Sequence, residues 1–173
     1  MIASNYQVRD AADSDLPGIL AIYNEAVLTT TATYDYETRP LEHRRAWLAD
    51  RRQRGLPVLV APDPSGEVLG WSALNPYHDR MGYRFTVENS VYVAAAHRGH
   101  GLGRALLAPL IDRAATLGLH AIIAAIDADN QASIRLHASF DFETVGHFKE
   151  VGFKFGRWLD VIYMERRLPK PIP

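Results

Sequence analysis

A glycine-rich segment over residues 97–104 carries the clearest chemistry in this sequence. It reads His-Arg-Gly-His-Gly-Leu-Gly-Arg, follows the apolar stretch 90–93 and leads into the helix-like stretch 101–117. The first amides of a helix have no partner within it, and the helix dipole adds partial positive charge there, so the segment favours an anion. Glycines also lack the Cβ that would keep a phosphate from the backbone. The segment predicts a phosphate or pyrophosphate site, with an ordinary turn and helix cap as the alternative.

The spacing of these glycines excludes two common phosphate motifs. The dinucleotide pattern G-x-G-x-x-G fails, because the sixth residue is Arg104 when counted from Gly99 and Leu106 when counted from Gly101. The P-loop fails because no lysine follows the glycines at the required place. The pattern that remains, R-x-x-G-x-G over residues 98–103, resembles the R/Q-x-x-G-x-G/A signature of the GNAT family of N-acetyltransferases. In that family the loop holds the pyrophosphate of acetyl-coenzyme A.

Glu88 is the first candidate catalytic residue. It lies in the strand-like stretch 86–93, between apolar and β-branched neighbours, where a carboxylate is disfavoured unless it is paired. A partly buried carboxylate with a pKa raised towards neutrality suits general-base catalysis. An edge-strand glutamate that faces solvent is the alternative.

A second catalytic candidate is His137, in a predicted short helix over residues 130–139. In many GNAT members such a helix presents an asparagine to the pantetheine arm and a tyrosine to the thioester sulfur. Asn130 matches the asparagine, and His137 stands at the tyrosine position, where a histidine can donate a proton to the departing thiolate. A histidine packed against the sheet is the alternative. Asp141 stands where the family usually has glycine, and aspartate can adopt the required left-handed conformation at some cost.

Two arginines, Arg80 and Arg84, precede Glu88 and suggest a clamp for an anionic group such as a carboxylate. Four patterns occur in order: T-V-E-x-S-V-Y-V, R-G-x-G-L-G, S-I-R-L-H and G-x-K-F-G-R-W-x-D. Together they resemble the GNAT branch that contains the phosphinothricin and methionine sulfoximine N-acetyltransferases, over residues 7–168. Members of this branch acetylate the α-amino group of glutamate-like amino acids, and they are homodimers that often complete the substrate pocket across the interface.

The resemblance implies a site, residue by residue. Glu88 is expected to be the base, acting through water, and His137 a supporting acid or base. Acetyl-coenzyme A is expected to contact Val91, Tyr92, Val93, Arg98, Gly99, His100, Gly101, Leu102, Gly103, Arg104 and Asn130. The amino-acid substrate is expected to contact Thr31, Tyr34, Arg80, Arg84, Glu88, Asn89 and Ser90. No metal is expected.

Composition narrows the class of protein. The chain has 173 residues, of which 47% are hydrophobic and 23% charged, and its formal net charge is −1, as is typical of a soluble globular domain. The arginines form no basic stripe, which argues against nucleic-acid binding. Cysteine is absent, which excludes disulfides and a cysteine acyl-enzyme. We find no signal peptide and no apolar run long enough to span a membrane, so we expect a cytoplasmic protein.

Periodicity predicts the elements that must position these residues. The expected order is β-α-α-β-β-β-α-β-α-β-β, which predicts an α/β fold with one mixed sheet flanked by helices; this is also the order of the GNAT fold. The predicted strands cover 6–9, 58–61, 68–74, 85–93, 121–126 and two stretches within 142–168, with a bend at 155–158. The predicted helices begin near residues 16, 40, 101 and 130, and the charged run 42–54 is interpreted as a solvated helix face. Residues 1–168 are expected to form one domain, followed by a flexible proline-rich tail over 169–173.

The sequence therefore predicts an acetyl-coenzyme A-dependent N-acetyltransferase for a small amino acid or analogue, working by direct transfer. Two alternatives stay open. One is acetylation of a protein or peptide, and the other is a non-catalytic module that binds acyl-coenzyme A.

Overall fold

The computed structural model describes residues 6–169, and these residues share one seven-stranded sheet in the order β1-β2-β3-β4-β5-β7-β6. Neighbouring strands run antiparallel except β4 and β5, which are parallel. The strands are β1 (Arg9–Asp10), β2 (Val58–Pro62), β3 (Val68–Pro76), β4 (Thr86–Val93), β5 (Ala121–Asp127), β6 (Glu143–Lys154) and β7 (Arg157–Arg167). The α-helices are α1 (Leu16–Thr29), α2 (Leu41–Gln53), α3 (Leu102–Thr116) and α4 (Gln131–Ala138), and three short 3-10 helices cover Asp13–Asp15, Met81–Tyr83 and Ala95–His97.

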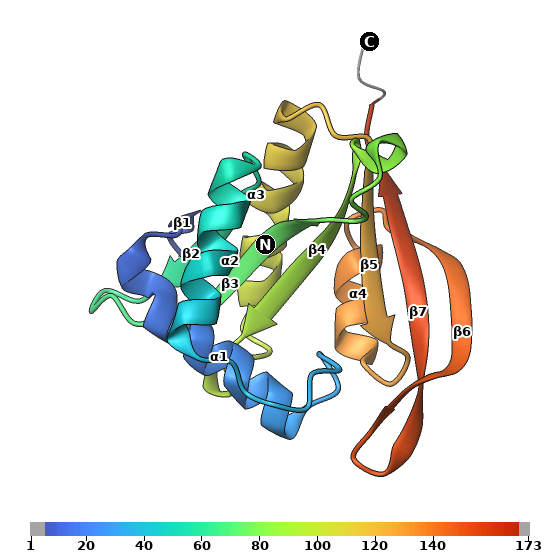
Figure 1. Cartoon of the computed structure of the whole chain (residues 1–173), viewed down its shortest axis with the longest axis horizontal. Helices are drawn as coiled ribbons and strands as arrows, with labels where there is room; N and C mark the ends of the chain where they lie inside the picture. The colour runs from blue at the N-terminus through green and yellow to red at the C-terminus, as the bar shows by residue number, and fades with distance from the viewer. Residues whose placement is uncertain (1–5, 170–173) are drawn as a thin grey trace.

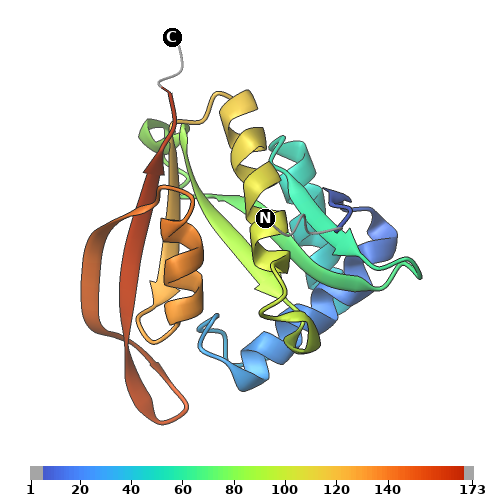
Figure 2. The same cartoon turned by 180° about the vertical axis from the view of Figure 1, so that it is seen from behind.

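The helices form a layer on each face of the sheet. Helices α1 and α2 cover one face (Figure 1), and α3 and α4 cover the other (Figure 2). Each layer has its own core: Leu107 and Leu110 of α3 pack on Val87 and Ile122 of the sheet, and residues of α1 and α2 pack around Trp71. Burying both faces in this way is the ordinary reason for a three-layer arrangement.

Strand β4 is the central strand for function, because its side chains alternate between the two layers. Val87 and Val91 belong to the core under α3, whereas Tyr92 packs in the core under α1 and α2. Glu88 therefore faces the α1–α2 side of the sheet, and Asn89 faces the α3–α4 side.

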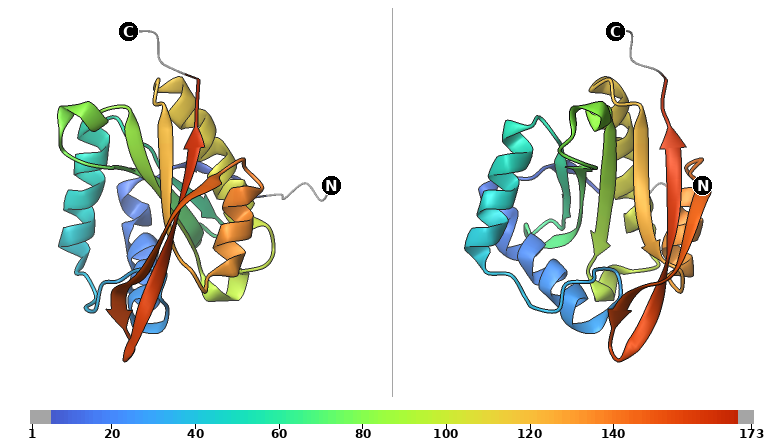
Figure 3. Two further views of the ribbon diagram at one scale, coloured as in Figure 1. Left: turned by 90° about the vertical axis from the view of Figure 1, so that its right-hand side faces the viewer. Right: turned by 45° about the vertical axis from the view of Figure 1, so that its right-hand side comes forward.

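The parallel pair β4–β5 separates partway along its length. Its pairing covers only three positions, Thr86 with Ala121 through Glu88 with Ile123. Beyond Glu88 the strands diverge, as the right-hand view of Figure 3 shows. The edge of β4 after Glu88 therefore has backbone groups that β5 does not occupy, and they are free to bind a ligand.

The observed order of elements confirms the predicted mixed sheet flanked by helices. Asp141 adopts φ +59°, as predicted for the residue at the family's glycine position. The predicted bend is a two-residue hairpin turn in which Phe155 and Gly156 both have positive φ, between the paired Lys154 and Arg157.

The structure differs from two of the predictions, and a third lies mostly outside the described residues. The first strand is shorter than predicted: only Arg9 and Asp10 pair with β2, while Tyr6 and Val8 pack against the apolar cluster beside α3. The interpretation of residues 42–54 as a solvated face is wrong for Arg44, which is 3% exposed and stacks on the rings of Tyr23 and Trp47. The predicted proline-rich tail lies, apart from its first residue, outside the described residues.

Candidate active site

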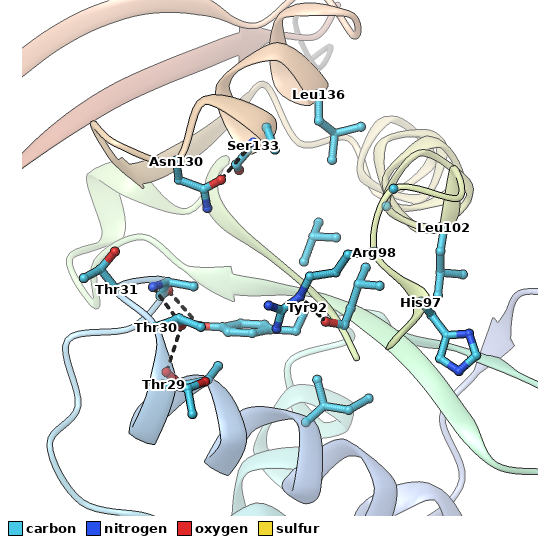
Figure 4. Close-up of a pocket in the computed structure, with 18 of the residues that line it drawn as sticks. Thr29, Thr30, Thr31, Tyr92, His97, Arg98, Leu102, Asn130, Ser133 and Leu136 are labelled. Carbon is cyan, nitrogen blue, oxygen red and sulfur yellow. Dashed lines mark hydrogen bonds between the residues drawn. The ribbon is translucent and has the colours of Figure 1, made fainter. Parts of the chain in front are cut away.

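A cleft of about 690 Å³ opens where β4 and β5 diverge. Its walls are the end of α1 with the loop that follows, the edge of β4, the glycine segment and the start of α4 (Figure 4). Every predicted coenzyme A contact except His100 lines it: Val91, Tyr92, Val93, Arg98, Gly99, Gly101, Leu102, Gly103, Arg104 and Asn130. Thr31, predicted to contact the amino acid, lines it too. Its volume is in the range of small-molecule sites.

The glycine segment has the geometry of an anion site. Gly99 and Gly101 have φ of +80° and +83°, and a Cβ added to either would meet no atom within 4 Å. Gly101 caps α3 with its backbone, and no side chain bonds the first amides of that helix, so they are left for a ligand. Gly103 has a different reason: a Cβ there would lie 3.1 Å from Leu136, so glycine lets α3 approach α4.

Two arginines place positive charge on this cleft. The Arg98 Nε donates to the carbonyl of Val93 at 3.1 Å, and the Arg104 guanidinium donates to the Ser139 hydroxyl at 3.0 Å and stacks on the ring of Phe140. The Arg98 guanidinium also lies 4.0 Å from a carboxylate oxygen of Glu25. Each arginine keeps N–H groups that these contacts do not use. Since guanidinium groups bind phosphate oxygens well, they complement the glycine segment.

Asn130 lies opposite, at the N-cap of α4. Its Oδ1 accepts a hydrogen bond from the Ser133 amide at 3.1 Å (Figure 4), which is the usual bond of an asparagine cap. This bond fixes the side-chain amide and leaves its NH₂ group at the cleft as a donor.

A smaller cleft of about 100 Å³ adjoins the first, sharing Ala32, Val91, Tyr92, Asn130 and Ser133 as walls. Its own walls include Glu88, Asn89, Ser90, Asp127 and His137. The structure thus brings to one place both predicted catalytic residues, Glu88 and His137, and two further predicted substrate contacts, Asn89 and Ser90.

Glu88 has the properties of a general base. Its side chain is half-buried, and burial raises its pKa above the usual value for a glutamate. Within residues 6–169, no basic side chain forms an ion pair with Glu88 that would counter this effect. A carboxylate in such surroundings binds a proton more readily than one in water, which suits it to take a proton from an ammonium group.

His137 is buried, with 3% of its surface exposed. Its Nδ1 lies 2.8 Å from the Ser133 carbonyl oxygen and its Nε2 lies 2.9 Å from the Asn89 amide nitrogen, and its ring meets Phe142 edge to face. Burial lowers the pKa of His137 below the usual value. The imidazole is therefore neutral at neutral pH and bonded at both nitrogens.

The remaining predicted substrate contacts differ in whether they lie at this cleft. The Ser90 hydroxyl is bonded by the Asn75 amide at 3.0 Å. The Tyr34 hydroxyl lies 3.5 Å from a carboxylate oxygen of Asp127, and burial together with that carboxylate raises the pKa of Tyr34 to about 12. Arg80 and Arg84 are exposed and line neither cleft.

The position of the two arginines follows from the loop that carries them. The Arg84 guanidinium donates to the Met81 carbonyl and stacks over the ring of Phe85, at the start of β4. The glycine segment follows the other end of that strand (Figure 1). Their role as a substrate clamp stays a prediction.

Sequence reasoning missed the contacts that hold the loop after α1. The Lys154 ammonium, on a residue that is 2% exposed, donates to the carbonyls of Thr30 and Thr33 at 2.8 and 2.7 Å. Gly152 leaves room for the ring of Tyr34, which a Cβ would approach to 2.3 Å. These contacts join residues more than a hundred positions apart, so no local pattern indicated them.

Comparisons with known proteins agree with this geometry. The model of the acetyltransferase (GNAT) family matches residues 19–142, so the chain belongs to this family. An L-methionine sulfoximine/L-methionine sulfone acetyltransferase of Pseudomonas aeruginosa is 50% identical over 161 residues, which cover 93% of this chain and 94% of that protein. The family and branch predicted from the four motifs are therefore confirmed.

Two solved structures share the fold closely. An acetyltransferase structure from Salmonella typhimurium, determined with its cofactor acetyl-CoA, has a TM-score of 0.94 and 43% identity and covers 98% of each chain. A ribosomal-protein-alanine N-acetyltransferase from Brucella melitensis has a TM-score of 0.91 and 47% identity, covering 94% of this chain and 99% of that one. Within residues 6–169, no helix has the length and apolar character needed to cross a membrane.

Proposed function

We propose that this protein transfers the acetyl group of acetyl-coenzyme A to the α-amino group of a small amino acid or analogue, such as methionine sulfoximine, methionine sulfone or phosphinothricin. The observation that carries the proposal is the pair of joined clefts. A long cleft with an anion-binding glycine segment leads to a cleft of about 100 Å³ that contains Glu88. The smaller volume suits a single amino acid better than a folded chain.

The larger cleft fits coenzyme A. Gly99 and Gly101 leave open space above uncapped helix amides for the pyrophosphate. The unpaired edge of β4 over Val91–Val93 offers backbone groups to the amide-bearing pantetheine arm, as a neighbouring strand would. Asn130 adds a side-chain amide on the opposite wall. Bound there, acetyl-coenzyme A supplies an activated acyl group.

Glu88 would take a proton from the ammonium group of the acceptor, directly or through one water molecule. The freed amine then forms the N–C bond as the C–S bond breaks, and the nitrogen passes its surplus proton to the sulfur, which leaves as the thiol of coenzyme A. The sequence has no cysteine to carry an acyl group, and the Ser90 hydroxyl in the smaller cleft is bonded by Asn75, so direct transfer is the simplest route. Backbone amides near Val91 are placed to stabilise charge on the carbonyl oxygen.

We also propose that the enzyme is a cytoplasmic homodimer and that it can confer resistance to phosphinothricin-type herbicides. Support for a dimer comes from apolar side chains exposed on the β6–β7 hairpin, which is the free edge of the sheet in Figure 1. They are Val145, Phe148, Val151, Phe153, Phe155 and Trp158, each at least 44% exposed. Exposed apolar side chains gathered on one hairpin are a common mark of a protein–protein interface. A partner there would also offer a way to complete the substrate pocket.

A second candidate is acetylation of a protein N-terminus, which the name of the Brucella melitensis relative favours. Thiol release measured over a panel of free amino acids and peptides separates the two, with each product identified by mass. We expect rapid thiol release with methionine sulfoximine, methionine sulfone or phosphinothricin and little with peptides. Acetylated peptides alone, with no acetylated amino acid, would contradict the proposal.

A further inference from the structure

We infer that His137 positions Asn89 and does not exchange a proton during the reaction, and that the Asn89 oxygen held in this way accepts a hydrogen bond from the reacting amine. The observation behind this inference is a chain of hydrogen bonds from Ser133 through His137 to Asn89 at the wall of the smaller cleft. The part that concerns the amine rests on the proposed acetyl transfer. The part that concerns His137 rests only on contacts within the protein and does not depend on the reaction.

The neighbours of His137 decide which of its nitrogens carries the hydrogen. Nδ1 lies 2.8 Å from the carbonyl oxygen of Ser133, one turn earlier in α4, and 3.3 Å from the hydroxyl of the same residue. The carbonyl oxygen is the closer partner and only accepts hydrogen bonds, whereas the hydroxyl can donate or accept, so Nδ1 is the donor and carries the hydrogen. The ring is buried and its pKa is lowered, so no second proton is bound at neutral pH. Nε2 is therefore an acceptor.

This tautomer fixes the orientation of the Asn89 side chain. The Asn89 nitrogen Nδ2 lies 2.9 Å from Nε2 of His137 and must donate to it. The reversed amide would place two acceptors against each other. The other end of the amide, Oδ1, is then an acceptor that is buried without a hydrogen-bond partner within residues 6–169. Asn89 is itself 8% exposed, so leaving this oxygen unpaired costs free energy that a ligand with an N–H group would recover.

The location of Asn89 points to the amine as that ligand. Asn89 and His137 line the smaller cleft with Glu88, and neither lines the larger one. Glu88 and Asn89 lie on adjacent positions of β4 and face opposite sides of the sheet, but the pairing of β4 with β5 ends at Glu88, so both residues border the opening between the two strands. An amine between them can donate one N–H to the Glu88 carboxylate and another to Asn89 Oδ1. Two fixed acceptors would set the direction of its lone pair.

The same geometry removes His137 as a proton donor to the departing thiolate. Its only N–H is directed at the Ser133 carbonyl, and Nε2 is covered by the Asn89 amide. Turning the ring would break both bonds in a buried site. Besides His137, the ionisable side chains among the walls of the cleft are Glu88, Tyr92 and Asp127, and neither lysine nor arginine is among them.

Nuclear magnetic resonance of the imidazole nitrogens in the whole protein tests the tautomer and protonation state of His137 without any substrate. His137→Gln identifies the signal. We expect the neutral Nδ1–H form at neutral and alkaline pH. An Nε2–H tautomer, or a His137 that is protonated at neutral pH, would overturn the inference. This result stands even if no amine in the panel is acetylated, so it is separate from the proposed function.

The kinetics of variants test whether His137 acts through Asn89 and whether Asn89 binds the amine. In His137→Gln the side-chain oxygen can still accept from Asn89, so we expect kcat and the KM for the amine to stay within about threefold of wild type. His137→Leu and Asn89→Leu should each raise the amine KM about tenfold. The double variant should be no worse than Asn89→Leu, because both act through one contact. The dissociation constant of coenzyme A should not change, and thermal unfolding checks that each variant folds.

A different pattern would contradict the inference. If His137 donates a proton, both His137→Gln and His137→Leu should lower kcat by about a hundredfold or more with the amine KM unchanged. Independent losses in the double variant, or weaker binding of coenzyme A by Asn89→Leu, would also overturn it.

Discussion

The two joined clefts of this protein are built in different ways. In the larger cleft, the wall that suits an anion and an amide-bearing arm is built mainly by backbone: the unpaired edge of β4 and the glycine segment that caps α3, both from the continuous stretch 91–104. Side chains from α1, the loop after it and α4 complete the walls. The smaller cleft is formed by side chains from four separate places: the loop after α1, β4, β5 and α4. The backbone wall of the larger cleft is local in the sequence, whereas the smaller cleft depends on side chains that only the fold brings together.

This difference indicates what each cleft tolerates. A backbone site needs glycine conformations and an open strand edge, and most side chains around it can change. A side-chain site needs each group held in place by others, as His137 holds Asn89 and Asn75 holds Ser90. The loop after α1 borders both clefts and is itself held by Lys154, a residue 124 positions from Thr30. Substrate choice in the smaller cleft therefore depends on distant contacts.

The largest expected effect tests the chemistry of the smaller cleft. Glu88→Gln removes the proposed base while keeping the shape of the side chain. We expect kcat to fall about 100- to 10,000-fold, measured by thiol release at saturating substrates. In wild type, kcat should rise with pH as Glu88 loses its proton, with a midpoint above the usual glutamate range because its pKa is raised. Full activity in the variant would remove Glu88 from the mechanism.

The next effect tests the backbone site. Gly101→Ala forces a Cβ into a left-handed conformation at φ +83° and into the space left for the pyrophosphate. We expect the KM for acetyl-coenzyme A to rise about tenfold or more. Gly55→Ala is the matched control, because Gly55 has φ +68° with equally open surroundings but lines neither cleft. If both variants changed that KM equally, the effect would belong to stability and not to the site.

A smaller effect should follow from releasing the loop after α1. Lys154→Met keeps most of the side-chain volume but leaves the carbonyls of Thr30 and Thr33 without a donor. We expect a loss of about 1–3 kcal/mol in the free energy of unfolding, with higher KM values for both substrates, since the loop borders both clefts. Lys149→Met removes an exposed lysine of the same strand and should change neither quantity. Unchanged kinetics in Lys154→Met would show that the loop needs no such anchor.

The smallest effect concerns stability and pH. The pKa of Glu88 is raised in the folded state, so its contribution to stability is complete below the unfolded pKa and is lost as pH rises through the folded pKa. The Glu88→Gln variant has no ionisable group at this position, so it does not lose this stability as pH rises. Its melting temperature should match wild type at about pH 4 and exceed it at about pH 8. Glu67→Gln, at an exposed position, controls for the change of one surface charge. A variant less stable than wild type at the higher pH would contradict the burial of an unpaired carboxylate.

The sequence was informative where the structure is local. The order of elements and the glycine segment follow from hydrophobic period and spacing, and the left-handed Asp141 follows from the motif that it interrupts. The burial of Arg44 did not follow, because its aromatic partners Tyr23 and Trp71 come from other elements.

The smaller cleft shows the same limit. Glu88 and His137 could be singled out by type and position, but the bond that ties His137 to Asn89 joins residues 48 positions apart. A local sequence pattern carries no information about such a contact. It could therefore leave two roles open for His137, and only the geometry distinguishes a proton donor from a positioning residue.

The central claim is that the larger cleft binds coenzyme A and the smaller one performs the transfer. Calorimetric titration of coenzyme A into wild type, Glu88→Gln and Gly101→Ala tests it most directly. We predict that the dissociation constant stays within about threefold of wild type in Glu88→Gln and rises about tenfold or more in Gly101→Ala. Weakened binding in Glu88→Gln together with unchanged binding in Gly101→Ala would contradict the claim.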